Sequence, residues 1–225
     1  MRLLLISSSV VHGYGYLDHA EEELRRILGS RRVAFVPFAK QDHEAYTATV
    51  RERLAKMNVD VVQVRGRAEI ETAEAIFVGG GNTFRLLKRL YDEGLMEPIR
   101  DRVRNGGVPY IGSSAGTNVA SISIRTTNDM PIVYPPTFDA LGFVLFQINP
   151  HYQDPDAAST HKGETREERI REFHEENDTP VVGLREGSML RGADATITLV
   201  GDKPARIFRR GMEPVELPPA SRVEL

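Results

Sequence analysis

Short apolar segments alternate with amphipathic segments of helical periodicity over the first half of the chain, and this alternation restricts the fold most. The expected strands are residues 3–7, 32–37, 59–64, 75–78 and 108–111. The expected helices between them are residues 18–28, 44–57, 82–93 and 96–104. Strands that alternate with helices at this spacing favour a mostly parallel, doubly wound α/β sheet. Right-handed crossovers then flank both faces of that sheet with helices.

The second half of the chain is less regular. Residues 141–149 and 181–184 are apolar enough for strands, and residues 164–176 are typical of a charged helix. From Thr196 onward, the segments TITLV, ARIFRR and PVEL favour short antiparallel strands at the edge of the sheet. No internal repeat, low-complexity linker or change in composition divides the sequence, so we expect residues 1–225 to form a single domain.

Charge and composition exclude several classes of function. The chain has 225 residues, with 29 basic against 32 acidic side chains and no long block of either sign. A nucleic-acid partner is therefore not expected, and a small molecule or peptide is favoured as substrate. The absence of cysteine excludes disulfides, thiolate metal sites and cysteine nucleophiles. The histidines lack the spacing of a metal site, and we expect no cofactor.

The N-terminal segment MRLLLISSSV has one basic residue and a short apolar run. The run is too short for a signal peptide and lacks a small-residue cleavage site, so we interpret it as a first buried strand. No apolar stretch approaches the roughly 20 residues that cross a bilayer. We therefore expect a cytoplasmic protein without a membrane partner. The sequence does not distinguish a monomer from a homodimer.

Ser114 stands at the centre of Gly112-Ser113-Ser114-Ala115-Gly116, which matches the G-x-S-x-G pattern of a nucleophile elbow. The pattern needs small residues two positions before and after the serine, because the chain turns sharply there from a strand into a helix. It also fits an ordinary turn whose serines cap a helix. The apolar VPYI before it and TNVAS after it favour the elbow. In an elbow, the amide of Ala115 can donate to an oxyanion.

A second glycine-rich turn, Gly79-Gly80-Gly81, also follows a short strand and precedes a helix. Glycines let backbone amides approach a ligand closely. Neither GK[ST] nor G-x-G-x-x-G is present to indicate a nucleotide loop. In a doubly wound sheet both turns lie at the carboxyl ends of strands, where ligands bind. We expect an amide near Gly81 to complete an oxyanion hole of two donors with Ala115.

A serine nucleophile needs a general base, and histidine suits that role near neutral pH. His151 directly follows the apolar FVLFQINP, so a strand end carries it toward the face of Ser114. We expect His151 to be the base. His161, in a polar loop, remains ambiguous. The histidines in contexts typical of solvated surface residues are His12, His19, His43 and His174.

The third member of a catalytic triad is a carboxylate that orients the imidazole. Asp129 lies in the polar loop RTTNDMP after the expected nucleophile helix, and Glu186 follows the expected strand VVGL. Both acids fit the role, and the residues alone leave the choice open.

Several segments, in one order along nearly the whole chain, carry a family resemblance. They are RLLLISSS, VGGGNTF, IGSSAGTN, IRTTNDMPIV, QINPHY, HKGETREERIRE and LREG. Together they resemble the peptidase E (α-aspartyl dipeptidase) family of serine peptidases, which also contains cyanophycinases. The segments TTNDMPI and HKGETRE favour the peptidase E branch. The chain departs from the best-known members at Ser113, where those proteins carry a tryptophan.

The resemblance implies a flavodoxin-like fold of the class I glutamine-amidotransferase type. It implies that Ser114 is the nucleophile and His151 the base, and that the oxyanion amides are those of Gly81 and Ala115. The catalytic acid of the family corresponds to Glu186 or Asp129 in this chain. We favour Glu186 as the residue that orients the imidazole.

The resemblance also implies a substrate, an N-terminal Asp-Xaa dipeptide with a β-carboxylate and an ammonium. Asp129 would bind the ammonium, and an arginine would pair with the carboxylate. An ion pair on the helix face with Glu168 or Glu172 is the alternative for Arg166. The candidate cations for the carboxylate are Arg166 and Arg125, followed by Lys162 and His161.

The leading hypothesis is a serine peptidase that hydrolyses Asp-Xaa dipeptides through an acyl-enzyme on Ser114. A cyanophycinase-like hydrolase of β-Asp-Arg polymer would use the same serine with a different substrate groove. A non-catalytic α/β module that binds a ligand is the third alternative. It is disfavoured because the serine, the histidine and both acids are present.

Overall fold

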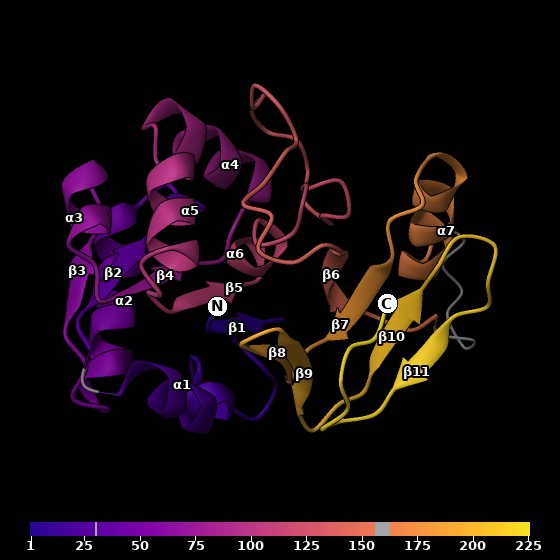
Figure 1. The fold of residues 1–225 in the computed structure, drawn as a ribbon, viewed down its shortest axis with the longest axis horizontal. Coiled ribbons are helices and arrows are strands. Elements are labelled where there is room, and N and C mark those ends of the chain that lie inside the picture. The colour runs from indigo at the N-terminus through magenta and orange to yellow at the C-terminus, as the bar shows by residue number, and fades with distance from the viewer. Residues whose placement is uncertain (30, 156–162) are drawn as a thin grey trace.

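The computed structural model describes residues 1–29, 31–155 and 163–225, and its largest element is a seven-stranded sheet (Figure 1). The first five strands in spatial order run parallel, β8 runs antiparallel to β1, and β9 antiparallel to β8. The mostly parallel, doubly wound architecture expected from the sequence is confirmed. In spatial order the strands are β3 (Val61–Gln63), β2 (Val33–Val36), β4 (Ala75–Val78), β5 (Tyr110–Ser113), β1 (Leu3–Ile6), β8 (Ser188–Ala193) and β9 (Thr196–Gly201).

Helices cover both faces of this sheet (Figure 1). One face carries η1 (Asp18–Ala20), α1 (Glu21–Leu28) and α2 (His43–Ala55). The other carries α3 (Arg67–Glu71), α4 (Thr83–Asp92), α5 (Met96–Arg104) and α6 (Ala115–Asn118). Successive residues of a strand point to opposite faces, which is why two apolar clusters form. No helix within the described ranges is long and apolar enough to cross a bilayer.

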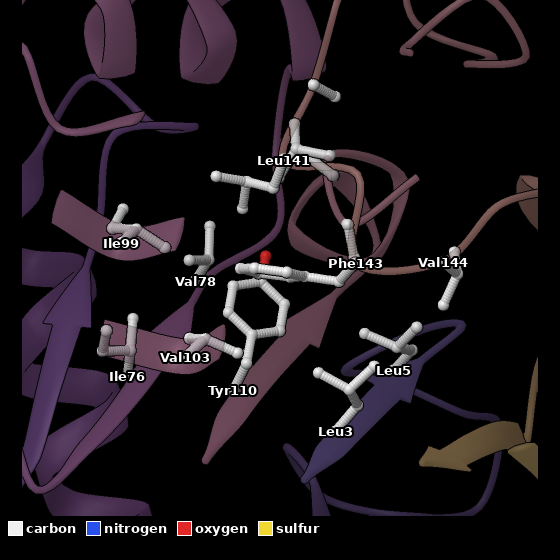
Figure 2. Packing of buried hydrophobic residues seen from close by; sticks show 14 of the residues in the cluster. Leu3, Leu5, Ile76, Val78, Ile99, Val103, Tyr110, Leu141, Phe143 and Val144 are labelled. Carbon is white, nitrogen blue, oxygen red and sulfur yellow. The ribbon is translucent and has the colours of Figure 1, made fainter. Parts of the chain in front are cut away.

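Figure 2 shows the cluster beneath α5, where Ile76, Val78 and Tyr110 of two adjacent strands meet Ile99 and Val103. All five side chains are buried. Burial of apolar side chains is the main favourable contribution to folding. The packing therefore fixes β4 and β5 relative to each other, and with them the two glycine-rich turns at their carboxyl ends.

A second, four-stranded sheet lies beside the β8–β9 end of the first (Figure 1). Its strands are β11 (Val215–Leu217), β10 (Ala205–Phe208), β7 (Val181–Arg185) and β6 (Gln147–Tyr152). β6 and β7 are parallel, whereas β10 is antiparallel to both β7 and β11. The helix α7 (Arg166–Glu176) packs on this sheet, with Ile170 in one apolar cluster with Tyr152, Val181 and Phe208.

The expected strand at residues 141–149 is wrong in its first part, because β6 begins only at Gln147. The preceding residues form a largely buried loop, in which Leu145 is exposed, and amides of this loop bond to the residues that directly follow α6. The Leu141 amide donates to the Val119 carbonyl, and the Phe143 amide to the Ala120 carbonyl. The apolar character of this segment thus reflects burial in the core rather than pairing in a sheet.

The C-terminal strands also differ from expectation. The segment TITLV forms β9 at the edge of the first sheet as expected, but ARIF and VEL belong to the second sheet. The helix α3 and the strand β8 were not predicted. In β8, a Cβ on Gly192 would lie 3.0 Å from the Leu3 Cβ, so this glycine marks the close approach of β8 to β1.

Polar caps hold the first turns of α4 and α7. The Asn82 side chain accepts from the Arg85 amide over 3.0 Å at the start of α4. At the start of α7, the Thr165 hydroxyl accepts from the Glu168 amide over 3.1 Å, and the Glu168 carboxylate accepts from the Thr165 amide over 2.6 Å. Such caps satisfy amides that a helix leaves unpaired.

Candidate active site

β5 ends at Ser113, and Ser114 turns the chain into α6 with a φ of 52° and a ψ of −108°. A positive φ is strained for a residue with a side chain. Two glycines permit the turn, since a Cβ on Gly112 would overlap the Gly116 carbonyl and one on Gly116 would overlap the Val78 carbonyl. Ser113 is fully buried, so the position that departs from the family pattern presents no surface to a substrate. The strand-turn-helix setting predicted for Ser114 is present.

Ser114, His151 and Glu186 form a continuous chain of hydrogen bonds. The Ser114 Oγ lies 2.8 Å from the His151 Nε2, and the His151 Nδ1 lies 2.6 Å from the Glu186 Oε1. With the ring proton on Nδ1, the imidazole donates to the carboxylate and Nε2 accepts from the serine hydroxyl. The side chains of His151 and Glu186 are 35% and 43% exposed, so the chain of bonds is open to solvent.

These three side chains come from different parts of the fold. Ser114 follows β5 of the first sheet, His151 belongs to β6 of the second, and Glu186 lies in the turn between β7 and β8. The sequence left Glu186 and Asp129 as alternatives beside the imidazole, and in the structure Glu186 is the acid that contacts it.

The amides of the glycine-rich turn have distinct partners. The first of the three glycines donates to a β2 carbonyl, and Gly80 donates to the buried Tyr46 hydroxyl over 2.8 Å. Gly81 has a φ of 137°, a conformation that favours glycine. Among the described residues, the amides of Gly81 and Ala115 donate to no protein group. Both amides therefore remain without a protein acceptor in the described part of the chain.

Asp129 bonds to the first turn of α4 and to its own loop, and among the described residues it makes no hydrogen bond to His151. Its Oδ2 accepts from the Thr83 amide over 2.7 Å, from the Thr83 hydroxyl over 2.6 Å and from the Thr127 hydroxyl over 3.3 Å. The amino end of a helix stabilises a carboxylate. The sequence analysis missed both threonines, although the place of Thr83 after Asn82, at a helix start, is a signal for such a role.

Arg166 is the first residue of α7 and is half-buried. Burial lowers the pKa of its guanidinium, and the charge of Arg169 acts in the same direction, whereas Asp129 raises it. The influence of Asp129 places the two residues within electrostatic reach of each other. Within the described ranges Arg166 forms no ion pair on the helix face, and Glu168 bonds to Thr165 instead.

The other candidate cations are placed differently. Arg125 is exposed, and its Nη1 donates over 3.1 Å to the Oδ1 of Asn177, the residue directly after α7. Arg125 and Arg166 therefore lie at opposite ends of that helix. Lys162 and His161 lie outside the described residues.

The other histidines that the structure describes take no part in the hydrogen bonds between Ser114, His151 and Glu186. His174 was expected at the surface, but it is buried, with its Nε2 3.0 Å from the Thr179 carbonyl oxygen. Burial lowers the pKa of His19, although nearby Glu186 acts to raise it. In the part of the chain that the structure describes, no group of three His, Asp or Glu side chains is arranged to hold a metal ion.

The model of a known family, described as Peptidase family S51, matches residues 3–200. The matched range contains Ser114, His151 and Glu186. The chain belongs to peptidase family S51. It is therefore a peptidase, and the family resemblance expected from the ordered segments is confirmed.

Individual proteins similar to this S51 peptidase support the family assignment. Peptidase E of Streptomyces coelicolor is 58% identical over 222 residues, which cover 96% of this chain and 91% of the relative. A Drosophila melanogaster protein named "Probable alpha-aspartyl dipeptidase" is 51% identical over 224 residues, covering 96% and 93%. The crystal structure of a peptidase from an acI-B1 Actinobacterium has a similar fold, with a TM-score of 0.71 at 17% identity over 100% of this chain and 96% of that one.

Proposed function

We propose that this S51 peptidase is a serine dipeptidase that cleaves N-terminal aspartate from Asp-Xaa dipeptides through an acyl-enzyme on Ser114. The observation that carries the proposal is the chain of hydrogen bonds from Ser114 through His151 to Glu186. In this chain the imidazole of a candidate base lies within hydrogen-bonding distance of a candidate nucleophile through one nitrogen and of an orienting carboxylate through the other.

In the acylation half of the reaction, the Ser114 Oγ attacks the carbonyl carbon after aspartate while its proton passes to the His151 Nε2. Glu186 accepts from the Nδ1 proton and stabilises the imidazolium that forms. The tetrahedral intermediate then collapses and the carbon–nitrogen bond breaks. The Nε2 proton passes to the departing amine, which leaves as the free amino acid Xaa.

Water completes the reaction. His151 takes a proton from water as the oxygen attacks the ester carbon of the acyl-enzyme. Collapse of the second tetrahedral intermediate returns the proton to the Ser114 Oγ and releases aspartate. The 35% exposure of the His151 side chain is consistent with access of water to its Nε2.

The amides of Gly81 and Ala115 are assigned to the oxyanion of both intermediates. They are the two donors beside Ser114 that remain without protein partners among the described residues. A Cβ on the neighbouring Gly80 would lie 3.0 Å from the Ser114 Cβ, so the glycine-rich turn is close against the nucleophile. Preorganised donors of this kind supply a large part of the rate enhancement in acyl transfer.

Selection for aspartate is assigned to Arg166 and Asp129. Arg166 pairs with the substrate β-carboxylate, and Asp129 binds the ammonium that marks the N-terminus. Two observations support this assignment: Arg166 is half-buried, which strengthens a charge pair, and it lies within electrostatic reach of Asp129. The name of the Drosophila relative, "Probable alpha-aspartyl dipeptidase", agrees with this substrate class.

The proposal is tested by kcat/KM across Asp-Leu, Asn-Leu, Ala-Leu and Nα-acetyl-Asp-Leu. We expect Asp-Leu to exceed Asn-Leu by about 10- to 100-fold, since asparagine keeps the shape but loses the charge that pairs with Arg166. Acetylation removes the ammonium and should abolish cleavage. Equal rates for Asp-Leu and Asn-Leu would refute the charge pairing. Faster cleavage of β-Asp-Arg polymer than of Asp-Leu would favour the cyanophycinase-like alternative.

A further inference from the structure

Ser7 directly follows β1 and is fully buried, and its hydroxyl reaches both parallel strands of the second sheet. Its Oγ accepts from the His151 amide over 3.0 Å and donates to the Leu184 carbonyl over 2.7 Å. Its own amide donates over 3.1 Å to the carbonyl of Ser188, the first residue of β8. A single small residue at the end of β1 thus bonds to β6, β7 and β8.

The register of β6 and β7 shows what this hydroxyl replaces. Pro150 pairs with Leu184 and Tyr152 with Arg185, so the ladder shifts at His151. In a regular parallel ladder, amides and carbonyls of the two strands bond to each other directly. Here the Ser7 hydroxyl lies between the amide of one strand and the carbonyl of the other, where a direct bond would otherwise form.

The backbone of His151 needs such support. Its φ is 54°, a conformation that costs free energy for a residue with a side chain and persists only where the surroundings hold it. Its amide is fixed by Ser7. The preceding carbonyl, that of Pro150, accepts from the Asn128 side chain over 2.7 Å. Hydrogen bonds on both sides of the strained residue therefore set the direction of the imidazole.

The same region of β1 also holds the other two members of the catalytic chain. The Ile6 carbonyl accepts from the Ser114 amide over 3.0 Å. Leu184, which accepts from Ser7, lies two residues before Glu186 on the same strand and turn. The last residue of β1 and the residue after it therefore bond to the backbone at or near each of Ser114, His151 and Glu186.

We propose that Ser7 is a positioning residue, which holds the backbone of His151 and the end of β7 so that the imidazole lies between Ser114 and Glu186. The inference rests on the proposed serine mechanism. Ser7 has no contact with substrate in this account and acts only through the two strands. Its loss should therefore lower kcat while leaving substrate binding intact.

The test is Ser7→Ala, measured for kcat and KM on Asp-Leu. We expect kcat to fall by about 10- to 100-fold, because a displacement of the base by about 1 Å is costly to proton transfer. KM should stay near its wild-type value. The proton NMR signal of the His151 Nδ1 proton should shift, because its bond to Glu186 is lengthened. Ser7→Cys, which keeps the volume and a weak donor, should give an intermediate kcat and serves if the alanine variant does not fold.

The matched control is Ser123→Ala. Ser123 is also buried, and its hydroxyl accepts over 2.5 Å from the side chain of Gln147, the first residue of β6. Its loss removes a buried hydrogen bond at the opposite end of the same strand. We expect a comparable decrease in melting temperature in both variants, but a wild-type kcat and an unshifted Nδ1 signal in Ser123→Ala.

The inference is overturned if Ser7→Ala keeps the wild-type kcat, or if both alanine variants lose kcat in proportion to their loss of stability. Failure of the proposed function gives a different result: the wild-type protein would not cleave Asp-Leu. The Nδ1 signal needs no substrate, so it would still report whether Ser7 holds the imidazole against Glu186.

Discussion

The two sheets contribute to the candidate site in different ways. The first sheet supplies Ser114 and the amides of Gly81 and Ala115, all of which lie where a parallel strand runs into a helix. The second sheet and the turn after it supply His151 and Glu186. The first contribution depends on backbone geometry and glycine, whereas the second depends on side chains held by hydrogen bonds. Substitutions in the two sheets should therefore differ in how they affect activity and stability.

The largest expected effect is that of Ser114→Ala. Removal of the nucleophile should lower kcat by about 10⁶-fold, as for other serine hydrolases whose residues act as a unit. The fold should persist, because the strained turn depends on the flanking glycines rather than on the hydroxyl. The measurement is kcat on Asp-Leu, with circular dichroism to check the fold. Near-wild-type turnover would exclude Ser114 as nucleophile.

Next in size is Glu186→Gln, for which we expect a kcat decrease of about 10³- to 10⁴-fold. The amide keeps the shape but no longer stabilises an imidazolium. Asp129→Asn is the matched comparison, since Asp129 bonds to Thr83 rather than to the imidazole. It should act mainly through KM. If Asp129→Asn reduced kcat as strongly as Glu186→Gln with KM unchanged, the assignment of the two acids would be reversed.

A smaller effect is expected at the substrate cation. Arg166→Gln should lower kcat/KM for Asp-Leu by about 10- to 100-fold and leave that for Ala-Leu nearly unchanged, because only the former brings a carboxylate to pair. Arg125→Gln removes an arginine at the other end of α7, where it bonds to Asn177. Its kinetics should match the wild type. If the ratio of kcat/KM for Asp-Leu to that for Ala-Leu were unchanged in Arg166→Gln, Arg166 would not be the residue that binds the aspartate side chain.

The glycine dependence of the first sheet is tested by stability. Gly116→Ala places a Cβ against the Val78 carbonyl and should destabilise the protein by about 1 to 3 kcal/mol. Gly66→Ala is the control, since a Cβ there meets nothing within 4 Å. Urea unfolding of both variants provides the comparison. Equal stabilities would show that the elbow tolerates side chains and that its glycines are not required for packing.

The smallest effect concerns an ion pair of the second sheet. Asp154 lies 2.6 Å from Arg185, and this bond lowers the Asp154 pKa below its ordinary value of 3.8. A depressed carboxyl pKa stabilises the fold above the unfolded pKa, and the contribution is lost as pH falls through the folded value. Because Asp154 is 47% exposed, Asp154→Asn should cost at most about 1 kcal/mol at neutral pH.

Urea unfolding at neutral pH, and again well below the ordinary aspartate pKa, measures the contribution of Asp154 to the free energy of unfolding. The difference between the wild type and Asp154→Asn should shrink on acidification. A difference that stayed constant would mean that the charge of Asp154 does not contribute to stability.

Much of the first sheet could be predicted from the sequence, and the reason is local. Apolar runs such as those of β1 and β4 are bounded by polar or glycine-rich segments, and G-x-S-x-G carries its own steric requirement. The glycine pattern therefore predicts the turn at Ser114 without knowledge of the rest of the fold. The prediction that His151 is the base depends more on the family resemblance than on its place at the end of a strand.

The second sheet was less predictable, because its pairings join distant segments. The choice between Glu186 and Asp129 depends on which loop reaches the imidazole, and no spacing in the sequence encodes that distance. The run from Leu141 has the apolar character of a strand but is buried as a loop. His174 lies in a charged helix yet faces the interior, where it bonds to Thr179. In each case tertiary packing determines the outcome.

The three consecutive glycines at residues 79–81 are identical in the sequence, but the bond from Gly80 to Tyr46 makes them inequivalent in the fold. Burial raises the pKa of the Tyr46 phenol. The phenol therefore stays neutral at any pH at which an imidazole serves as base, and the loop holds the same shape throughout. The hydroxyl of Tyr46, a residue of α2 outside the catalytic chain, thus occupies the Gly80 amide as the Val36 carbonyl occupies that of Gly79, so that among the described residues the Gly81 amide alone of the three has no protein acceptor.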